Sequence, residues 1–147
     1  MPPASAAAGV GEHFPELALR DQSGAAVRLG AGDRPLLLVW FRGAWCPYCR
    51  RQLVELSAAL ERVGGAGVRT LAVAPDPPEP LRALKDELKI PFPLISDPER
   101  RLVNRCELAH CVAIVDAAGV IRWGVVSGNW ERDLPARALI QAAYRLR

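Results

Sequence analysis

A single continuous apolar run marks the centre of the predicted fold. It extends from Leu36 to Phe41, is too short for a helix, and lies between Pro35 and Gly43. A run of this length between turn residues is typical of a strand that is buried on both faces of a sheet. We therefore expect residues 36–41 to form a central strand.

The chain after this strand changes to helical spacing. Its apolar side chains recur every three or four residues, at Leu53, Leu56, Leu60 and Val63. This spacing predicts an amphipathic helix. The helix is expected to begin at Pro47, because proline suits a first helical turn, and to end at Gly64-Gly65, because glycine favours helix ends.

Shorter alternating segments predict the remaining strands. Turn residues at Asp21-Gln22-Ser23-Gly24 predict a β-hairpin within residues 16–29, packed at an edge of the sheet. Apolar segments predict four further strands, at residues 68–74, 92–95, 111–115 and 120–126. The last two strands are joined by turn residues at 116–119, so they are expected to form a second hairpin.

Three further helices and one rigid loop complete the pattern. We expect a loop at 75–80, a short helix at 81–88, a helix from Asp97-Pro98 to about residue 105, and a last helix capped by Asp133. The apolar side of the last helix is predicted to consist of Leu134, Ala138, Leu139, Ala142 and Leu146.

Together these elements predict an α/β fold with one mixed central sheet, helices on both faces, and an N-terminal β-hairpin. The chain of 147 residues has the size of one domain. We expect residues 11–147 to form that domain and residues 1–10 to be a flexible N-terminus.

Composition and charge exclude several functional classes. The net charge is only +3, and the basic residues are spread along the chain, so a nucleic-acid partner is not expected. The longest apolar run is far shorter than the ~20 residues of a membrane-spanning helix. Residues 1–10 lack the pattern of a secretory signal, which predicts a cytoplasmic location.

The sharpest chemical signal is the pair of cysteines in Trp45-Cys46-Pro47-Tyr48-Cys49, where the central strand gives way to a helix. Backbone N–H groups at a helix start are unpaired, and they favour a thiolate over a thiol. The helix dipole contributes about 0.3–1 kcal/mol, which is less than one pKa unit. Cations must therefore help, and the nearby candidates are Arg42, Arg50 and Arg51.

Five stretches of the chain resemble one known family. They are residues 41–49, which contain the two cysteines, and residues 11–19, 74–79, 90–98 and 113–122. The first resembles the active-site stretch of thioredoxin-fold proteins, and the whole resembles peroxiredoxins of the alkyl hydroperoxide reductase and thiol-specific antioxidant family. The resemblance implies a thioredoxin-like fold and thiol redox chemistry.

The resemblance implies two different nucleophiles. The peroxiredoxin motif P-x-x-x-T-x-x-C places Cys49 at the reactive position, with Cys46 in place of Thr and Arg42 in place of Pro. In thioredoxins the first cysteine of the pair attacks, which would be Cys46. Helix geometry favours Cys46, because it faces the free N–H groups and Cys49 lies one turn inside. We therefore expect Cys46 to attack and Cys49 to resolve.

Several other residues are candidate parts of the site. Trp45, Pro47 and Tyr48 are expected to support the cysteine pair as wall, helix start and spacer. His110 is a candidate to orient or deprotonate a thiol. Cys106 and Cys111 are either small buried residues or additional redox thiols.

The expected function is that of a thiol-disulfide oxidoreductase or thiol peroxidase, without a cofactor or a metal, that reduces hydroperoxides or protein disulfides. Electrons would come from a thioredoxin- or glutathione-type donor, and the protein is a candidate homodimer. The alternative is a non-catalytic redox-sensing or zinc-holding module that uses four cysteines, Cys46, Cys49, Cys106 and Cys111.

Overall fold

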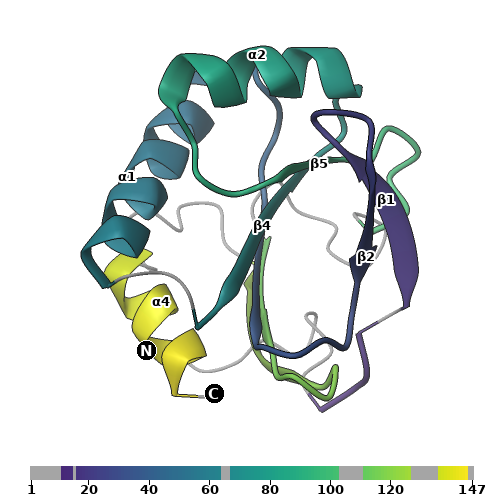
Figure 1. Ribbon diagram of the computed structural model, residues 1–147, viewed down its shortest axis with the longest axis vertical. Helices are drawn as coiled ribbons and strands as arrows, with labels where there is room; N and C mark the ends of the chain where they lie inside the picture. The colour runs from purple at the N-terminus through teal and green to yellow at the C-terminus, as the bar shows by residue number, and fades with distance from the viewer. Residues whose placement is uncertain (1–10, 15, 64–66, 103–110, 127–135, 146–147) are drawn as a thin grey trace.

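The computed structural model of the chain describes residues 11–14, 16–63, 67–102, 111–126 and 136–145. Within them, one mixed sheet of seven strands is flanked by helices (Figure 1). The predicted α/β fold with a mixed central sheet is therefore confirmed. The predicted flexible segment, residues 1–10, lies outside the described residues.

The strands form a sheet in the order β2-β1-β5-β4-β3-β6-β7. Their bounds are β1 (Leu17–Asp21), β2 (Ala26–Leu29), β3 (Leu36–Trp40), β4 (Arg69–Ala74), β5 (Leu94–Ser96), β6 (Cys111–Val115) and β7 (Ile121–Val126). The two predicted hairpins, β1–β2 and β6–β7, are confirmed, and they lie at opposite edges of the sheet. The N-terminal hairpin joins the sheet through antiparallel pairing of β1 with β5.

The apolar run at residues 36–41 forms the inner strand β3, as predicted. Strand β3 pairs with β4 in parallel and with β6 antiparallel, and every residue of β3 is buried. Leu37 and Val39 pack into one core cluster, while Leu36 and Leu38 pack into a second cluster on the other face. The strand is therefore held by hydrogen bonds on both sides and by apolar contacts on both faces.

Three described helices cover one face of the sheet: α1 (Pro47–Val63), α2 (Pro78–Leu88) and α4 (Ala136–Tyr144). Residues from all three pack into the same core cluster as Leu37 and Val39. In Figure 1, α1 and α4 lie on the left, α2 runs across the top, and the β1–β2 hairpin lies on the right. The connections β3-α1-β4 and β4-α2-β5 advance in one direction across the sheet, and right-handed crossovers then place both helices on one face.

The second face differs from the prediction over the residues described. A helix was expected from Asp97-Pro98 to about residue 105, but residues 98–102 form turns, and 103–105 lie outside the described residues. Asp97 is fully buried, and its carboxylate accepts the N–H groups of Arg101 and Leu102 at 2.8 and 2.9 Å. These bonds hold the chain in turns that bury Leu102 against the sheet.

The loop predicted at 75–80 is shorter than expected, because α2 begins at Pro78 rather than at residue 81. The first turn of a helix has no acceptors for its own N–H groups, so Pro78 and Pro80 lose no helical hydrogen bond there. The prolines that suggested a rigid connector are therefore part of the helix start.

The last helix turns a different side to the core than the sequence pattern suggested. Ile140 and Ala143 of α4 are fully buried, whereas Ala138 and Ala142 are only partly buried. The predicted apolar side thus missed its two central members, because the helix packs simultaneously on α1, β3 and β6. The predicted cap and the two ends of the stripe, Asp133, Leu134 and Leu146, lie outside the described residues, as does the side chain of Leu139.

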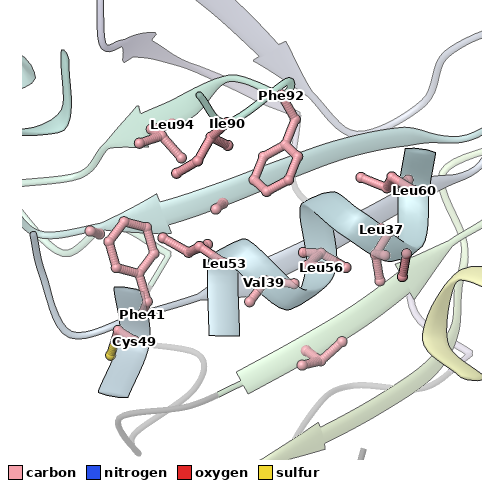
Figure 2. Close-up of a cluster of buried hydrophobic side chains, with 14 of the residues drawn as sticks. Leu37, Val39, Phe41, Cys49, Leu53, Leu56, Leu60, Ile90, Phe92 and Leu94 are labelled. Carbon is pink, nitrogen blue, oxygen red and sulfur yellow. The ribbon is translucent and has the colours of Figure 1, made fainter. Parts of the chain in front are cut away.

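Helix α1 supplies the largest share of helical side chains to the core. Figure 2 shows Leu53, Leu56 and Leu60 along the helix, with Cys49 at the N-terminal end of this row. The predicted helical stripe is confirmed for these leucines. In the part of the chain that the structure describes, no helix is long and apolar enough to cross a membrane.

Adjacent residues of α1 provide a test of this packing. Leu53 is 1% exposed and Val54 is 45% exposed. Leu53→Ala is expected to lower the free energy of unfolding by about 2–5 kcal/mol, because it removes buried methyl groups and leaves a cavity. Val54→Ala is expected to change it by less than about 0.5 kcal/mol. Urea titration of both variants measures the difference, and equal effects would contradict the described orientation of α1.

Candidate active site

The cysteine pair lies where β3 ends and α1 begins, as the sequence indicated. The Phe41 N–H still continues the sheet by donating to the Val73 carbonyl at 2.9 Å. A tight turn follows, in which the Cys46 N–H donates to the Gly43 carbonyl at 3.2 Å. The Arg50 N–H then donates to the Cys46 carbonyl at 3.0 Å, which is the first hydrogen bond of α1. Cys46 therefore lies one short hydrogen-bonded turn after the end of β3.

Both cysteines are free thiols and both are buried, with Cys46 5% exposed and Cys49 1% exposed. The Cys49 backbone N–H donates to the Cys46 sulfur at 3.3 Å. This is one of the unpaired donors at the start of a helix, and it stabilises negative charge on the sulfur. The start of α1 therefore supplies a backbone hydrogen-bond donor to the Cys46 sulfur.

Cys49 has the opposite environment. Burial, together with a hydrogen bond to the Cys46 side chain and the charge of that side chain, raises the pKa of the Cys49 thiol to about 12. The backbone of Arg42 and its positive charge act in the other direction but are outweighed. Cys49 is therefore a protonated thiol at neutral pH, and it can donate its hydrogen to Cys46.

The three arginines expected to assist the pair have different roles. Arg42 is exposed, and its charge acts on Cys49. Arg50 donates through Nη1 to the Ala44 carbonyl at 3.2 Å and forms an ion pair with Glu87 of α2. The Arg51 guanidinium lies 5.6 Å from the ring centre of Tyr48, at cation–π distance. The positive charge of Arg50 is thus balanced by the carboxylate of Glu87.

The other three residues of the motif differ in their exposure. Trp45 is 68% exposed, which makes it the most exposed large apolar side chain among the described residues. Tyr48 is partly buried and packs against the core cluster that contains both cysteines. Pro47 is exposed and is the first residue of α1.

Asp76 is a neighbour of the pair that the sequence analysis treated only as part of a loop. Its Oδ2 accepts the Ala44 N–H at 2.7 Å, although the two residues are 32 positions apart. Its own backbone carbonyl accepts the Ser96 hydroxyl at 2.6 Å. A sequence signal was present, because Asp76 follows β4, and parallel strands β3 and β4 end at the same edge of the sheet.

The other predicted site residues are only partly placed by the structure. Cys106 and His110 lie outside the described residues, and of Cys111 only the backbone is described. Cys111 begins β6 and precedes Val112, which pairs with Val39 near the end of β3. The backbone of Cys111 therefore lies at the same edge of the sheet as the pair. In the described ranges, no group of three or more His, Cys, Asp or Glu side chains is arranged to hold a metal ion.

Comparison with solved structures supports the fold. The structure superposes on the peroxidoxin BcpB from Mycobacterium tuberculosis with a TM-score of 0.77 and 15% identity, covering 93% of this chain and 94% of that chain. It superposes on the bacterioferritin comigratory protein of Xanthomonas campestris, a protein studied for alkyl peroxide reduction, with a TM-score of 0.73 and 19% identity, covering 86% and 92%. The predicted thioredoxin-like fold of the peroxiredoxins is confirmed.

Sequence comparison identifies the family. The chloroplast peroxiredoxin Q of rice, Oryza sativa subsp. japonica, is 30% identical over 88 residues, which cover 59% of this chain and 41% of the rice protein. The matched segments span between 41% and 60% of the curated relatives. The AhpC/TSA family profile matches residues 10–124, well over half of the sequence. The chain therefore belongs to the AhpC/TSA family, as its cysteine motif and the four other stretches suggested.

Proposed function

We propose that this protein is a thiol-dependent oxidoreductase that reduces hydroperoxides, with Cys46 as the nucleophile and Cys49 as the resolving thiol. The hydrogen bond from the Cys49 N–H to the Cys46 sulfur carries the assignment. It stabilises a thiolate on Cys46, while the pKa of Cys49, raised to about 12, keeps that sulfur protonated. Membership of the AhpC/TSA family supports the peroxide substrate.

The chemistry follows from these two protonation states. The Cys46 thiolate attacks one oxygen of the hydroperoxide; a sulfur–oxygen bond forms, the oxygen–oxygen bond breaks, and an alcohol or water leaves after taking a proton. Sulfur is oxidised to a sulfenic acid and the peroxide is reduced. The Cys49 sulfur then attacks Cys46, which forms the disulfide and releases water. An external dithiol returns two electrons through a mixed disulfide.

The external partners follow from the same cycle. A thioredoxin- or glutathione-type thiol is the proposed electron donor, because the cycle ends in a disulfide that only a thiol or dithiol exchanges directly. A cytoplasmic location fits this donor, because thiols are kept reduced there. Homodimer formation remains a sequence-based expectation.

A second candidate substrate is a protein disulfide, and the exposure of Trp45 favours it. An indole that is 68% exposed beside Cys46 offers apolar contact area to another polypeptide. In that reaction Cys46 would attack a disulfide sulfur and form a mixed disulfide, which Cys49 would then release. Steady-state turnover of the reduced protein with hydrogen peroxide and with a model disulfide, under one donor, separates the two substrates.

The first prediction concerns the pH dependence of thiol reactivity. An acid whose pKa is raised stays protonated until the pH approaches that value, so Cys49 should react slowly with iodoacetamide at neutral pH. In Cys46→Ser, burial still raises the pKa of Cys49, and its rate should keep rising through pH 9. At pH 7, Cys46 in the Cys49→Ser variant should react at least about tenfold faster than Cys49 in the Cys46→Ser variant. Mass spectrometry of the peptide containing residues 46–49 measures both, and a faster reaction at Cys49 would invert the assignment.

The second prediction concerns the intermediate. One equivalent of hydrogen peroxide should convert the reduced protein to a Cys46–Cys49 disulfide, detected by peptide mapping. Cys49→Ser should instead accumulate a sulfenic acid on Cys46 that dimedone traps, because no resolving thiol remains. Rapid dimedone labelling of Cys49 in Cys46→Ser would show that the peroxide attacks Cys49. Two thiols that stay free under peroxide would contradict the proposed reaction.

A further inference from the structure

The backbone of Ala44, two residues before Cys46, is held by charged side chains at both of its polar groups. Asp76 Oδ2 accepts its N–H at 2.7 Å, and Arg50 Nη1 donates to its carbonyl at 3.2 Å. Hydrogen bonds with one ionised partner are stronger than neutral ones. Two such bonds on one loop residue restrict its rotation and leave a single favoured conformation.

Both charged side chains are attached to elements other than the loop. Asp76 follows β4, and its carbonyl accepts the hydroxyl of buried Ser96 at the end of β5. Arg50 forms an ion pair with Glu87 of α2. Ala44 is therefore connected to the ends of two parallel strands and to the helix that packs beside β5.

Gly43 makes this arrangement possible. A Cβ on Gly43 would lie 2.6 Å from Trp45 Nε1 and 2.9 Å from Asp76 Oδ1, and its φ of +154° disfavours any other residue. The Trp45 indole and the Asp76 carboxylate thus both lie close to Gly43, and a larger residue there would have to displace them. Asp76 therefore holds the Ala44 backbone and lies against Gly43, as does the exposed indole of Trp45.

We propose that Asp76 and Arg50 are positioning residues that fix the Ala44 backbone and thereby hold the Cys46 sulfur at the Cys49 N–H. The idea rests on the proposed thiol chemistry of Cys46. Only Trp45 separates Ala44 from Cys46, so a rotation at Ala44 moves the sulfur relative to α1. Because Glu87 balances the charge of Arg50, the guanidinium acts through placement.

Asp76 could also affect the pKa of Cys46 through its negative charge. Two substitutions separate this effect from placement of the Ala44 backbone. Asp76→Asn and Asp76→Ala both remove the charge, but only Asn keeps an oxygen that accepts the Ala44 N–H. If Asp76 acts by placement, the pKa of Cys46 should be higher in the Ala variant than in the Asn variant, because the sulfur leaves its N–H donor. If it acts by charge, the two variants should have the same pKa.

The measurement is the pH profile of Cys46 alkylation by iodoacetamide in a Cys49→Ser background. We expect Asp76→Ala to react at pH 7 about 3- to 10-fold more slowly than Asp76→Asn, which is the loss of roughly one hydrogen bond to a thiolate. The fluorescence of Trp45 is obtained by subtracting the spectrum of a matched Trp45→Phe variant. Its emission maximum should shift in Asp76→Ala and stay unchanged in Asp76→Asn. Coincident pH profiles for Ala and Asn would overturn the proposal.

A double-mutant cycle tests whether the two residues act on the same backbone. Arg50→Met combined with Asp76→Ala should slow alkylation little more than the slower single variant, because residues that share one target are not additive. Arg62→Met removes an exposed cation from the last turn of the same helix and controls for charge. Effects of Arg50 and Asp76 that simply multiply would overturn the shared role.

These readouts do not depend on turnover. A reduced protein that consumes neither peroxide nor disulfide would contradict the proposed function, and the alkylation profiles would still report whether Asp76 positions Cys46. Circular dichroism and the urea midpoint identify any variant that has lost its fold. If Asp76→Ala does not fold, Asp76→Asn is compared with wild type instead. Equal pH profiles for these two proteins support placement, whereas a lower Cys46 pKa in Asp76→Asn contradicts it.

Discussion

Burial of β3 on both faces is the constraint from which the position of the cysteines follows. A strand with apolar side chains above and below it, and with a hydrogen-bonded strand on either side, has no surface on which to shift. Phe41 keeps this register for one more residue through its bond to Val73. The chain then has only a few residues in which to turn, and it enters α1 with Cys46 just ahead of the helix and Cys49 inside its first turn.

The two buried thiols at the start of α1 are chemically identical but have different surroundings. Both side chains belong to one core cluster, but Cys46 lies before the helix and its sulfur accepts the Cys49 N–H, whereas burial raises the pKa of Cys49 in the first turn. The start of the helix thus offers a hydrogen-bond donor to one sulfur, while burial disfavours charge on the other. The proposed reaction, which needs one nucleophilic sulfur and one protonated thiol, can use this difference.

The sequence was sufficient for features that depend on neighbouring residues. The central strand, the start of α1 at Pro47, both hairpins and the leucine row of α1 follow from local periodicity and turn residues, and the structure has them at those places. The start of α2 was missed because prolines signal both a loop and a first helical turn. The apolar side of α4 was missed because contacts with three other elements, rather than its own pattern, select the buried residues.

Contacts between distant residues were beyond local reasoning. Asp76 reaches Ala44 across 32 positions, and Arg50 reaches Glu87 across 37. The sequence offered Arg50 as a candidate for lowering the pKa of a thiol, but a partner on another helix directs its guanidinium to the loop backbone. Spacing predicts which residues lie on one helix or strand, whereas the topology of the sheet decides which side chains meet at its edge.

The exposure of Arg42, Trp45 and Pro47 has a consequence for how such a site diversifies. These residues border the pair but contribute little to the buried core, so substitutions there should be tolerated by the fold. Cys49 and the leucines that follow it have no such freedom, because they are also core residues. Selection or engineering for a new substrate therefore has its accessible positions on the N-terminal side of Cys46 and at Pro47, while the cysteine pair stays fixed.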